Sequence, residues 1–169
     1  MSKNQTLISL LVQRINEDHN RPALVGKRGG QDESLTWGQL GDRVCRLAVA
    51  LIRSGVQPGD RVVQVSENRL EWIVCDLAIQ LARAVHVPLH ATLSGRQIVE
   101  QVVDSGATKL FLSDCSQLTK VTDRMAELPG PLDFWVFDSS GGFSGGIQVA
   151  SLAQLEDRGD RSESAWVLE

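Results

Sequence analysis

The stretch from residue 59 to residue 94 constrains the fold most, because its pattern predicts a strand, a helix and a second strand. The β-branched run Val62–Val65 follows a Pro-Gly-Asp turn signal, and Val85–Leu89 predicts the second strand. Asn68 is placed to cap the helix, with Glu71 three residues later completing a capping box. Apolar residues then recur at helical spacing: Leu70, Ile73, Val74, Leu77, Ala78 and Leu81. Two strands joined by a helix of this length are almost always parallel, with a right-handed crossover.

The sequence before this unit predicts an amphipathic helix followed by a β-hairpin. The helix is indicated by Leu7, Leu11 and Ile15, which share one side of a helix. A strand over residues 21–25 and a returning strand over residues 34–36 predict the hairpin, with a loop between them over residues 27–32.

Signals for helix boundaries recur along the chain. Thr36, Ser94 and Asp114 are each predicted to start a helix, because a glutamine follows each of them three residues later. Gly55 and Gly106 are predicted to end the first two of these helices in the left-handed conformation. The third helix is expected to continue as far as the next Pro-Gly-Pro breaker.

Two more strands, over residues 109–112 and 134–137, alternate with these helices. Strands and helices that alternate through short connections predict an α/β domain whose mainly parallel sheet is covered by helices on both faces. We place this domain at residues 1–138. Residues 139–169 are expected to form a flexible Gly/Ser loop, a weak helix around residues 152–155 and a polar tail.

Composition limits the classes of function. A chain of 169 residues suits one sizeable domain, and a net charge of -4 with scattered Lys and Arg argues against a nucleic-acid binder. No apolar run is long enough to span a membrane, and the N-terminus lacks a signal cleavage site, so we expect a cytoplasmic protein. Cys45, Cys75 and Cys115 are odd in number and have no zinc spacing, so buried reduced thiols are expected.

Ligands of open α/β sheets bind beyond the carboxyl ends of the strands, so the loops there are the place to look for a site. His90 and Thr92 follow the strand that ends near residue 89, and we take them as the candidate substrate-binding residues. His86 and His90 are four residues apart, but they lie on a strand and at its exit. They therefore predict no shared metal site, and no metal-binding residue is expected.

The acidic residues around the helix that begins near residue 70 are predicted to have structural roles. Glu67 and Glu71 flank a helix start, where the helix dipole favours negative charge, so capping is preferred to acid catalysis. Asp76 lies on the polar face of the same helix and is expected to be solvated. The Gly/Ser loop over residues 139–146 does not end in the Lys and hydroxyl residue of a phosphate-binding P-loop. From the residues alone, the chain is a scaffold without a recognisable active site.

Four blocks of the sequence, in their order and spacing, resemble adenylate-forming enzymes. Leu35–Leu40 and Gly55–Val62 are similar to the opening of these enzymes. Ser66–Trp72 and Val87–Ser94 are similar to segments of long-chain acyl-CoA synthetases, and the likeness covers about residues 7–138. One departure is His90-Ala91, where the family commonly has an aromatic or polar residue followed by proline.

The resemblance implies a parent enzyme with two half-reactions. A carboxylate attacks the α-phosphate of ATP, with magnesium assisting, and the thiol of coenzyme A then displaces AMP to form a thioester. The family's phosphate loop and its segments for adenine, ribose and magnesium are not found in this sequence. We therefore assign no catalytic or cofactor-binding residue, and we expect an N-terminal part that is inactive alone.

The partners implied are the remainder of the parent enzyme and, in that enzyme, a fatty acid or other carboxylate. Apolar surface meant for the remainder is expected to favour self-association. Two alternatives stay open at this point. One is a non-enzymatic binding module of flavodoxin-like type, and the other is a regulatory pseudoenzyme that pairs with another subunit.

Overall fold

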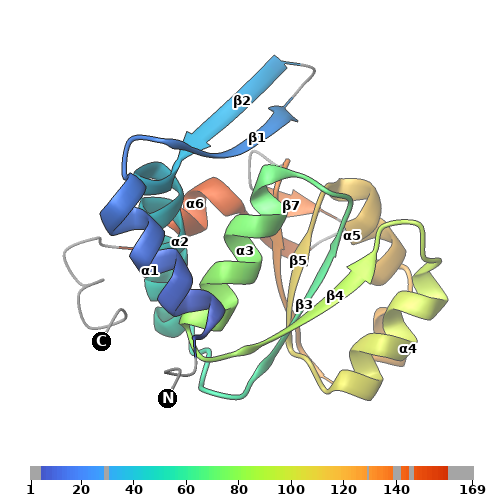
Figure 1. Ribbon diagram of the computed structural model, residues 1–169. Helices are drawn as coiled ribbons and strands as arrows, with labels where there is room; N and C mark the ends of the chain where they lie inside the picture. Colours follow the sequence, from blue (N-terminus) through green and yellow to red (C-terminus); the bar gives the residue numbers. More distant parts are fainter. Residues whose placement is uncertain (1–4, 29–30, 129, 139–141, 145–146, 160–169) are drawn as a thin grey trace.

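The computed structural model describes residues 5–28, 31–128, 130–138, 142–144 and 147–159, and it confirms the predicted α/β architecture (Figure 1). The helices are α1 (Leu7–Asp18), α2 (Trp37–Arg53), α3 (Leu70–Leu81), α4 (Gly95–Ser105), α5 (Cys115–Thr122), the 3₁₀ turn η1 (Met125–Glu127) and α6 (Leu152–Asp157). The strands are β1 (Pro22–Arg28), β2 (Gln31–Thr36), β3 (Arg61–Ser66), β4 (Val85–His90), β5 (Lys109–Leu112), β6 (Asp133–Val136), β7 (Gly142–Ser144) and β8 (Ile147–Ser151).

The central sheet has the strand order β4-β3-β5-β6-β8-β7, in which neighbouring strands are parallel except for the β7–β8 pair. The predicted unit over residues 59–94 forms the β3–α3–β4 edge of this sheet, with Val62 opposite His86. From β4 the chain crosses back through α4 to β5, on the other side of β3. The strand order therefore reverses between β3 and β5.

Each face of the sheet packs on its own apolar core. Helices α1, α2, α3 and α6 cover one face, and α4 and α5 cover the other (Figure 1). Strand β3 serves both cores, because Val62 packs with the first group of helices while Val63 and Val65 pack with the second. Phe111 and Trp135 lie in the first core with ring centroids 4.9 Å apart. Burial on both faces explains the continuous apolar character of the strands.

The predicted helix boundaries are mostly confirmed. The side chains of Thr36, Ser94 and Asp114 accept hydrogen bonds from backbone amides of the first turns of α2, α4 and α5. Gly55 and Gly106 follow their helices with φ of 90° and 66°, a conformation that glycine adopts without steric cost.

The capping box predicted at Asn68 is wrong. The residue that precedes α3 is Arg69, and its side chain makes no capping hydrogen bond. The Glu71 carboxylate, which was expected to reach back to the cap, is engaged by the Arg69 guanidinium instead. A charge-assisted pair competes successfully with a neutral amide for that carboxylate.

Three other boundaries differ from prediction. The hairpin strands extend to Arg28 and from Gln31, so residues 27–28 and 31–32 of the expected loop belong to strands. Helix α5 ends at Thr122, where η1 replaces the expected continuation to the Pro-Gly-Pro breaker. Within the expected Gly/Ser loop, residues 142–144 form β7, while residues 139–141 and 145–146 lie outside the described residues. The domain boundary expected at residue 138 stays a prediction.

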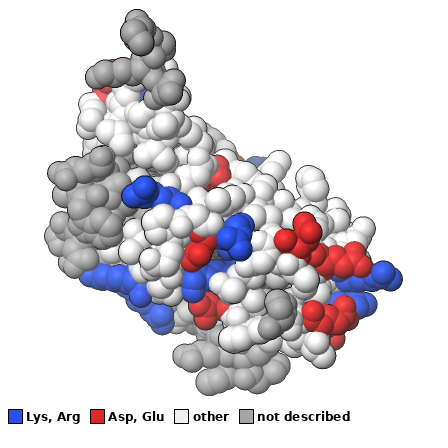
Figure 2. All heavy atoms as spheres, turned by 90° about the horizontal axis from the view of Figure 1, so that it is seen from below, with Lys and Arg blue, Asp and Glu red and all other residues white. Residues whose placement is uncertain are grey.

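The three cysteines differ in their exposure to solvent. Cys45 and Cys75 are buried, as predicted, and burial raises the pKa of the Cys75 thiol, whereas Cys115 is exposed because it starts α5 at the sheet edge. On the face shown in Figure 2, acidic and basic side chains are interspersed rather than gathered by sign. None of the described helices combines the length and hydropathy needed to cross a bilayer.

Candidate functional site at the carboxyl edge of the sheet

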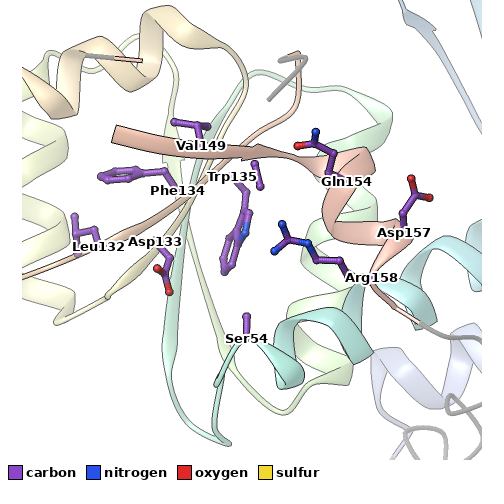
Figure 3. A pocket seen from close by; sticks show the side chains of 10 residues that line it. Ser54, Leu132, Asp133, Phe134, Trp135, Val149, Gln154, Asp157 and Arg158 are labelled. Carbon is purple, nitrogen blue, oxygen red and sulfur yellow. The ribbon is translucent and has the colours of Figure 1, made fainter. Parts of the chain in front are cut away.

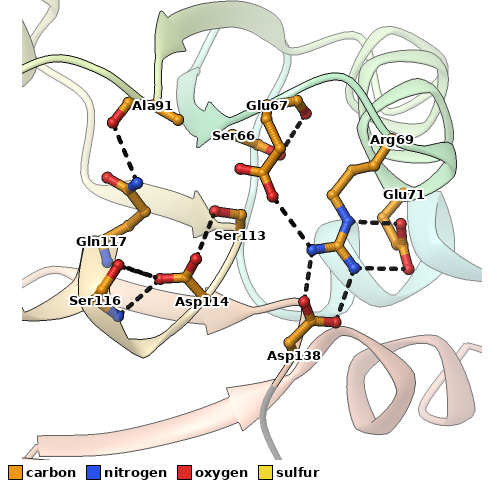
Figure 4. A network of polar contacts seen from close by, with 10 residues as sticks. All are labelled: Ser66, Glu67, Arg69, Glu71, Ala91, Ser113, Asp114, Ser116, Gln117 and Asp138. Carbon is orange, nitrogen blue, oxygen red and sulfur yellow. Dashed lines mark hydrogen bonds and ion pairs between the residues drawn. The ribbon is translucent and has the colours of Figure 1, made fainter. Parts of the chain in front are cut away.

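The loops that follow β3, β5 and β6 meet at one edge of the sheet (Figure 4). Ser66 ends β3, Ser113 follows β5, and Asp138 lies two residues beyond β6. Backbone hydrogen bonds continue the sheet into these loops, with the Ser113 amide donating to the Val65 carbonyl and the Asp138 amide donating to the Ser113 carbonyl. Because the strand order reverses between β3 and β5, this edge is where a ligand is expected in an open α/β sheet.

Arg69 lies at the centre of this edge and bonds one carboxylate from the first turn of α3 and one from the loop after β6. Its Nε and Nη2 donate to Glu71 at 2.9 and 3.2 Å, and its Nη1 and Nη2 donate to Asp138 at 2.6 and 2.7 Å. A third carboxylate, that of Glu67, lies 3.6 Å away. The guanidinium also lies over the Phe137 ring, 5.5 Å from its centroid. Arg69 therefore ties the start of α3 to the end of β6.

The electrostatic consequence is a guanidinium already saturated with carboxylates. The hydrogen bond with Asp138 raises the pKa of Arg69, against the effect of burial, and the bonds with Glu71 act in the same direction. The Arg69 side chain is 12% exposed. A phosphate arriving here would meet three carboxylates around one cation, so Arg69 in this arrangement is a structural clamp.

Asp114 organises the loop after β5. Its Oδ1 accepts from the backbone amides of Ser116 and Gln117 at 2.7 and 3.0 Å and from the Ser116 hydroxyl at 2.7 Å. Ser113 donates to the other oxygen at 3.4 Å. Burial works to raise the pKa of Asp114, but these hydrogen bonds hold it below its usual value. Asp114 is therefore an ionised cap of α5 and is not available as an acid.

The β4–α4 loop (residues 91–94) is fixed from α5. Lys120 Nζ donates to the carbonyls of Ala91 and Leu93 at 2.8 and 3.0 Å, and Gln117 Nε2 donates to Ala91 at 3.2 Å. At the start of α4, a Cβ on Gly95 would lie 2.4 Å from the Lys120 carbonyl oxygen, so the two helices approach closely there. This support holds the loop although the chain has Ala91 where the family commonly has proline.

The two candidate substrate-binding residues lie in and beside this loop. His90 ends β4 opposite Ser66, and Thr92 lies in the β4–α4 loop, and both are exposed. The structure thus places them at the carboxyl edge of the sheet, while a role in substrate binding stays a prediction. Sequence reasoning missed Arg69, Lys120 and Gln117 as the residues that build this edge.

The second histidine belongs to a different cluster. His86 faces α3, where its Nδ1 lies 2.8 Å from Asp76 Oδ1 and its ring meets the edge of Trp72. Asp76 is therefore not solvated as predicted, because its side chain is 18% exposed and also accepts from Gln80. Within the described ranges, no three His, Cys, Asp or Glu side chains converge as metal ligands would.

A hollow of about 750 Å³ opens at the opposite end of the strands, beside β6 and α6 (Figure 3). The Trp135 ring and the Arg158 guanidinium point toward one another across it. Lys109, the first residue of β5, lies at the same end of the sheet. Its ammonium group is already bonded to Asp133 at 2.7 Å and to the Ser54 carbonyl at 3.1 Å. The strand-order argument does not apply at this end, so we assign the candidate site to the carboxyl edge.

The fold is similar to that of several solved acyl-CoA ligases. The chain matches a long-chain-fatty-acid-CoA ligase (FadD1) from Archaeoglobus fulgidus with a TM-score of 0.80 at 16% identity, covering 95% of this chain and 31% of that one. It matches the anthranilate CoA ligase AuaEII with a TM-score of 0.80 at 18% identity, covering 94% of this chain and 29% of that one. These likenesses establish that the fold is that of an acyl-CoA synthetase.

Sequence comparisons define the family. The model for AMP-binding enzymes matches residues 11–142, and the chain belongs to this family. It is 37% identical over 95 residues to the long-chain-fatty-acid–CoA ligase FadD15 of Mycobacterium bovis, covering 56% of this chain and 16% of that protein. It is 36% identical over 109 residues to a feruloyl-CoA synthase of Amycolatopsis, covering 64% of this chain and 21% of that protein. The chain thus spans about a sixth to a fifth of the curated relatives it matches.

Proposed function

We propose that this chain is the N-terminal part of an ATP-dependent acyl-CoA synthetase that activates a fatty acid or a related carboxylic acid. The observation that supports this most is the family match over residues 11–142. A relative named as a long-chain-fatty-acid–CoA ligase favours an aliphatic substrate, while one named as a feruloyl-CoA synthase keeps aromatic acids within the class. No feature of the described residues favours a flavodoxin-like module instead.

The proposed parent reaction joins a carboxylate to coenzyme A through an acyl-adenylate, and ATP, magnesium and coenzyme A are its cofactors. Stabilising such a reaction requires cations and backbone donors directed at the transferring phosphate. The described residues at the carboxyl edge do not fit a magnesium–triphosphate group, because Glu71 and Asp138 already occupy the Arg69 guanidinium and loop carbonyls occupy Lys120. We therefore derive no catalytic step from this chain.

The role we propose for these residues is a framework that is inactive by itself. Isothermal titration with ATP and magnesium at neutral pH should give no saturable binding tighter than about 100 μM, which corresponds to about −5.5 kcal/mol. A dissociation constant below about 100 μM would refute the inactive framework. Release of pyrophosphate from ATP and a fatty acid by the chain alone would also refute it. The reading frame beyond residue 169 gives an independent check, since it should continue into a Gly-rich loop that ends in lysine.

The proposal also names partners and a location. The remainder of the parent enzyme is the expected partner, and apolar side chains such as Val25 and Val85, 74% and 48% exposed, are candidates for that contact. Light scattering of the isolated chain should therefore show self-association, and a strictly monomeric chain at high concentration would count against it. We propose a cytoplasmic location, which cell fractionation would check.

A further inference from the structure

A hollow of about 500 Å³ lies on the face of the sheet that α1, α2, α3 and α6 cover. It is bordered by α1, the base of the hairpin and α3. Its walls are almost entirely apolar, with Leu7 and Leu10 from α1, Trp37 from α2 and Ile73 and Leu77 from α3. Binding sites for small molecules are typically concave and apolar, measure roughly 300–1,000 Å³ and contain few polar groups. The hollow has this character, and it is separate from the loops that form the carboxyl edge.

Two charged residues, Arg14 and Asp76, line the hollow, and they differ in exposure and in how firmly they are held. Arg14 is 55% exposed and is paired with Asp18 at 3.0 Å, so its charge is compensated at the surface. Asp76 is 18% exposed, and its Oδ1 accepts from His86 Nδ1 and from Gln80 Nε2, each at 2.8 Å. Its Oδ2 receives no hydrogen bond from the described part of the chain.

The bonds to Asp76 fix both its position and its charge. Burial works to raise the pKa of this carboxyl, but the hydrogen bonds from His86 and Gln80 hold it below the usual value. The carboxylate is thus ionised at neutral pH and is held by two elements, α3 through Gln80 and β4 through His86. The Oδ2 atom is not among the buried atoms that lack a partner, so solvent reaches it from the hollow and a cation there would exchange its own hydration for an ion pair.

We propose that this hollow binds a small amphiphilic cation, with an aliphatic or aromatic body against the leucines and Trp37 and a protonated amine on Asp76 Oδ2. Charge complementarity selects the cation, because a carboxylate ligand of the same shape would face Asp76 while Arg14 is already paired. This site goes beyond the proposed function and does not depend on it.

The test compares three probes of equal chain length, n-octylammonium, octanoate and n-octanol, titrated into the full 169-residue chain and followed by amide NMR spectra. Octylammonium should give saturable shifts at the amides of Ile73 and Leu77, and octanoate and octanol should bind at least tenfold more weakly. Asp76→Asn should weaken octylammonium binding about tenfold, the scale of a hydrogen bond to a charged group. Asp104→Asn, which removes an exposed carboxylate from α4, should leave binding unchanged.

A second variant tests the apolar wall independently of Asp76. Leu10→Ser should weaken octylammonium binding severalfold, whereas Val103→Ser, at a side chain of similar exposure on α4 (45% against 41%), should have no effect. If Asp76→Asn does not fold, the ranking of the three probes and the Leu10 and Val103 pair still decide. Equal binding of octanoate and octylammonium would overturn the proposal, as would shifts at Ile73 and Leu77 that follow protein concentration, which would mean that a second copy covers the hollow.

Discussion

Arg69 offers the sharpest test, because it ties the start of α3 to the loop after β6 through two carboxylates of very different exposure. The Glu71 side chain is 6% exposed, and the Asp138 side chain is 49% exposed. Arg69→Met keeps much of the apolar stem, but it removes the cation that pairs with both carboxylates and lies over the Phe137 ring. The effect on the free energy of unfolding can therefore be assigned mainly to uncompensated charge.

The magnitude follows from the two exposures. Removing one partner of a buried ion pair costs about 3–5 kcal/mol, whereas an exposed pair contributes about 0–1 kcal/mol. Glu71 makes a further contact besides those with Arg69, so the buried loss falls at or below the low end of its range. We expect Arg69→Met to lower the free energy of unfolding by about 3 kcal/mol in total, with most of the loss arising at Glu71.

Urea unfolding at pH 7, followed by tryptophan fluorescence, measures this loss. Arg96→Met is the matched control, because Arg96 and Glu100 form an exposed pair on one helix (73% and 57% exposed) whose removal should have a far smaller effect than Arg69→Met. Removing the stranded charge in Arg69→Met/Glu71→Leu should recover part of the lost stability. Equal destabilisation by Arg69→Met and Arg96→Met, or no recovery in the double variant, would refute the role of uncompensated charge.

Three further predictions concern the loops at the same edge. Gly95→Ala should cost about 1–3 kcal/mol of unfolding free energy, because its Cβ would meet the Lys120 carbonyl, whereas Gly130→Ala, with nothing within 4 Å, should be near neutral in the same urea assay. Lys120→Met removes two hydrogen bonds from the β4–α4 loop and should speed hydrogen exchange of the loop amides about tenfold. The same change at the exposed Lys27 should leave the exchange of these amides unchanged. An unchanged exchange rate in Lys120→Met would mean that other contacts hold the loop. Asp114→Ala should cost about 1 kcal/mol at pH 7. Because the folded pKa of Asp114 lies below its ordinary value of 3.8, this stability is fully present above pH 3.8 and is lost as the pH falls through the lowered folded pKa. A penalty that does not shrink as the pH is lowered below 3.8 would contradict the assignment.

Local signals in the sequence were enough for most of the fold. Capping residues such as Thr36 and Ser94 act within one helical turn, and the β-branched strands carry their own pattern, so both were predicted correctly. The hairpin loop was predicted too long because residues 27–32 are polar and include two glycines, although Lys27 and Arg28 pair with the returning strand. Strand β7 was missed because it lies in a glycine-rich segment, and β8 was missed because its five residues are too few to show a clear periodicity.

The candidate site was predictable in place but not in its contacts. Strand order and the rule for open sheets locate the edge that bears His90 and Thr92. The contacts that build this edge join distant positions, with Arg69 and Asp138 separated by 69 residues and Lys120 and Ala91 by 29. A sequence pattern does not pair residues at such separations. A local signal was available in the acidic residues one or two positions after three of the strands, which are Glu67, Asp114 and Asp138.

The contacts at this edge also bear on where the chemistry of the proposed enzyme would come from. Three polar groups that build this edge are already used to hold the loops: Arg69 by two carboxylates, Asp114 by the start of α5, and Lys120 by two carbonyls. A group used in this way cannot turn to a substrate without losing bonds that fix the backbone, at a cost of about 1–3 kcal/mol for each hydrogen bond that is left unmade. Groups that act on a phosphate must instead be held in place with free donors. An edge whose polar groups are satisfied internally suits a rigid support, which is the role we propose for it beside reactive groups supplied by another part of the parent enzyme.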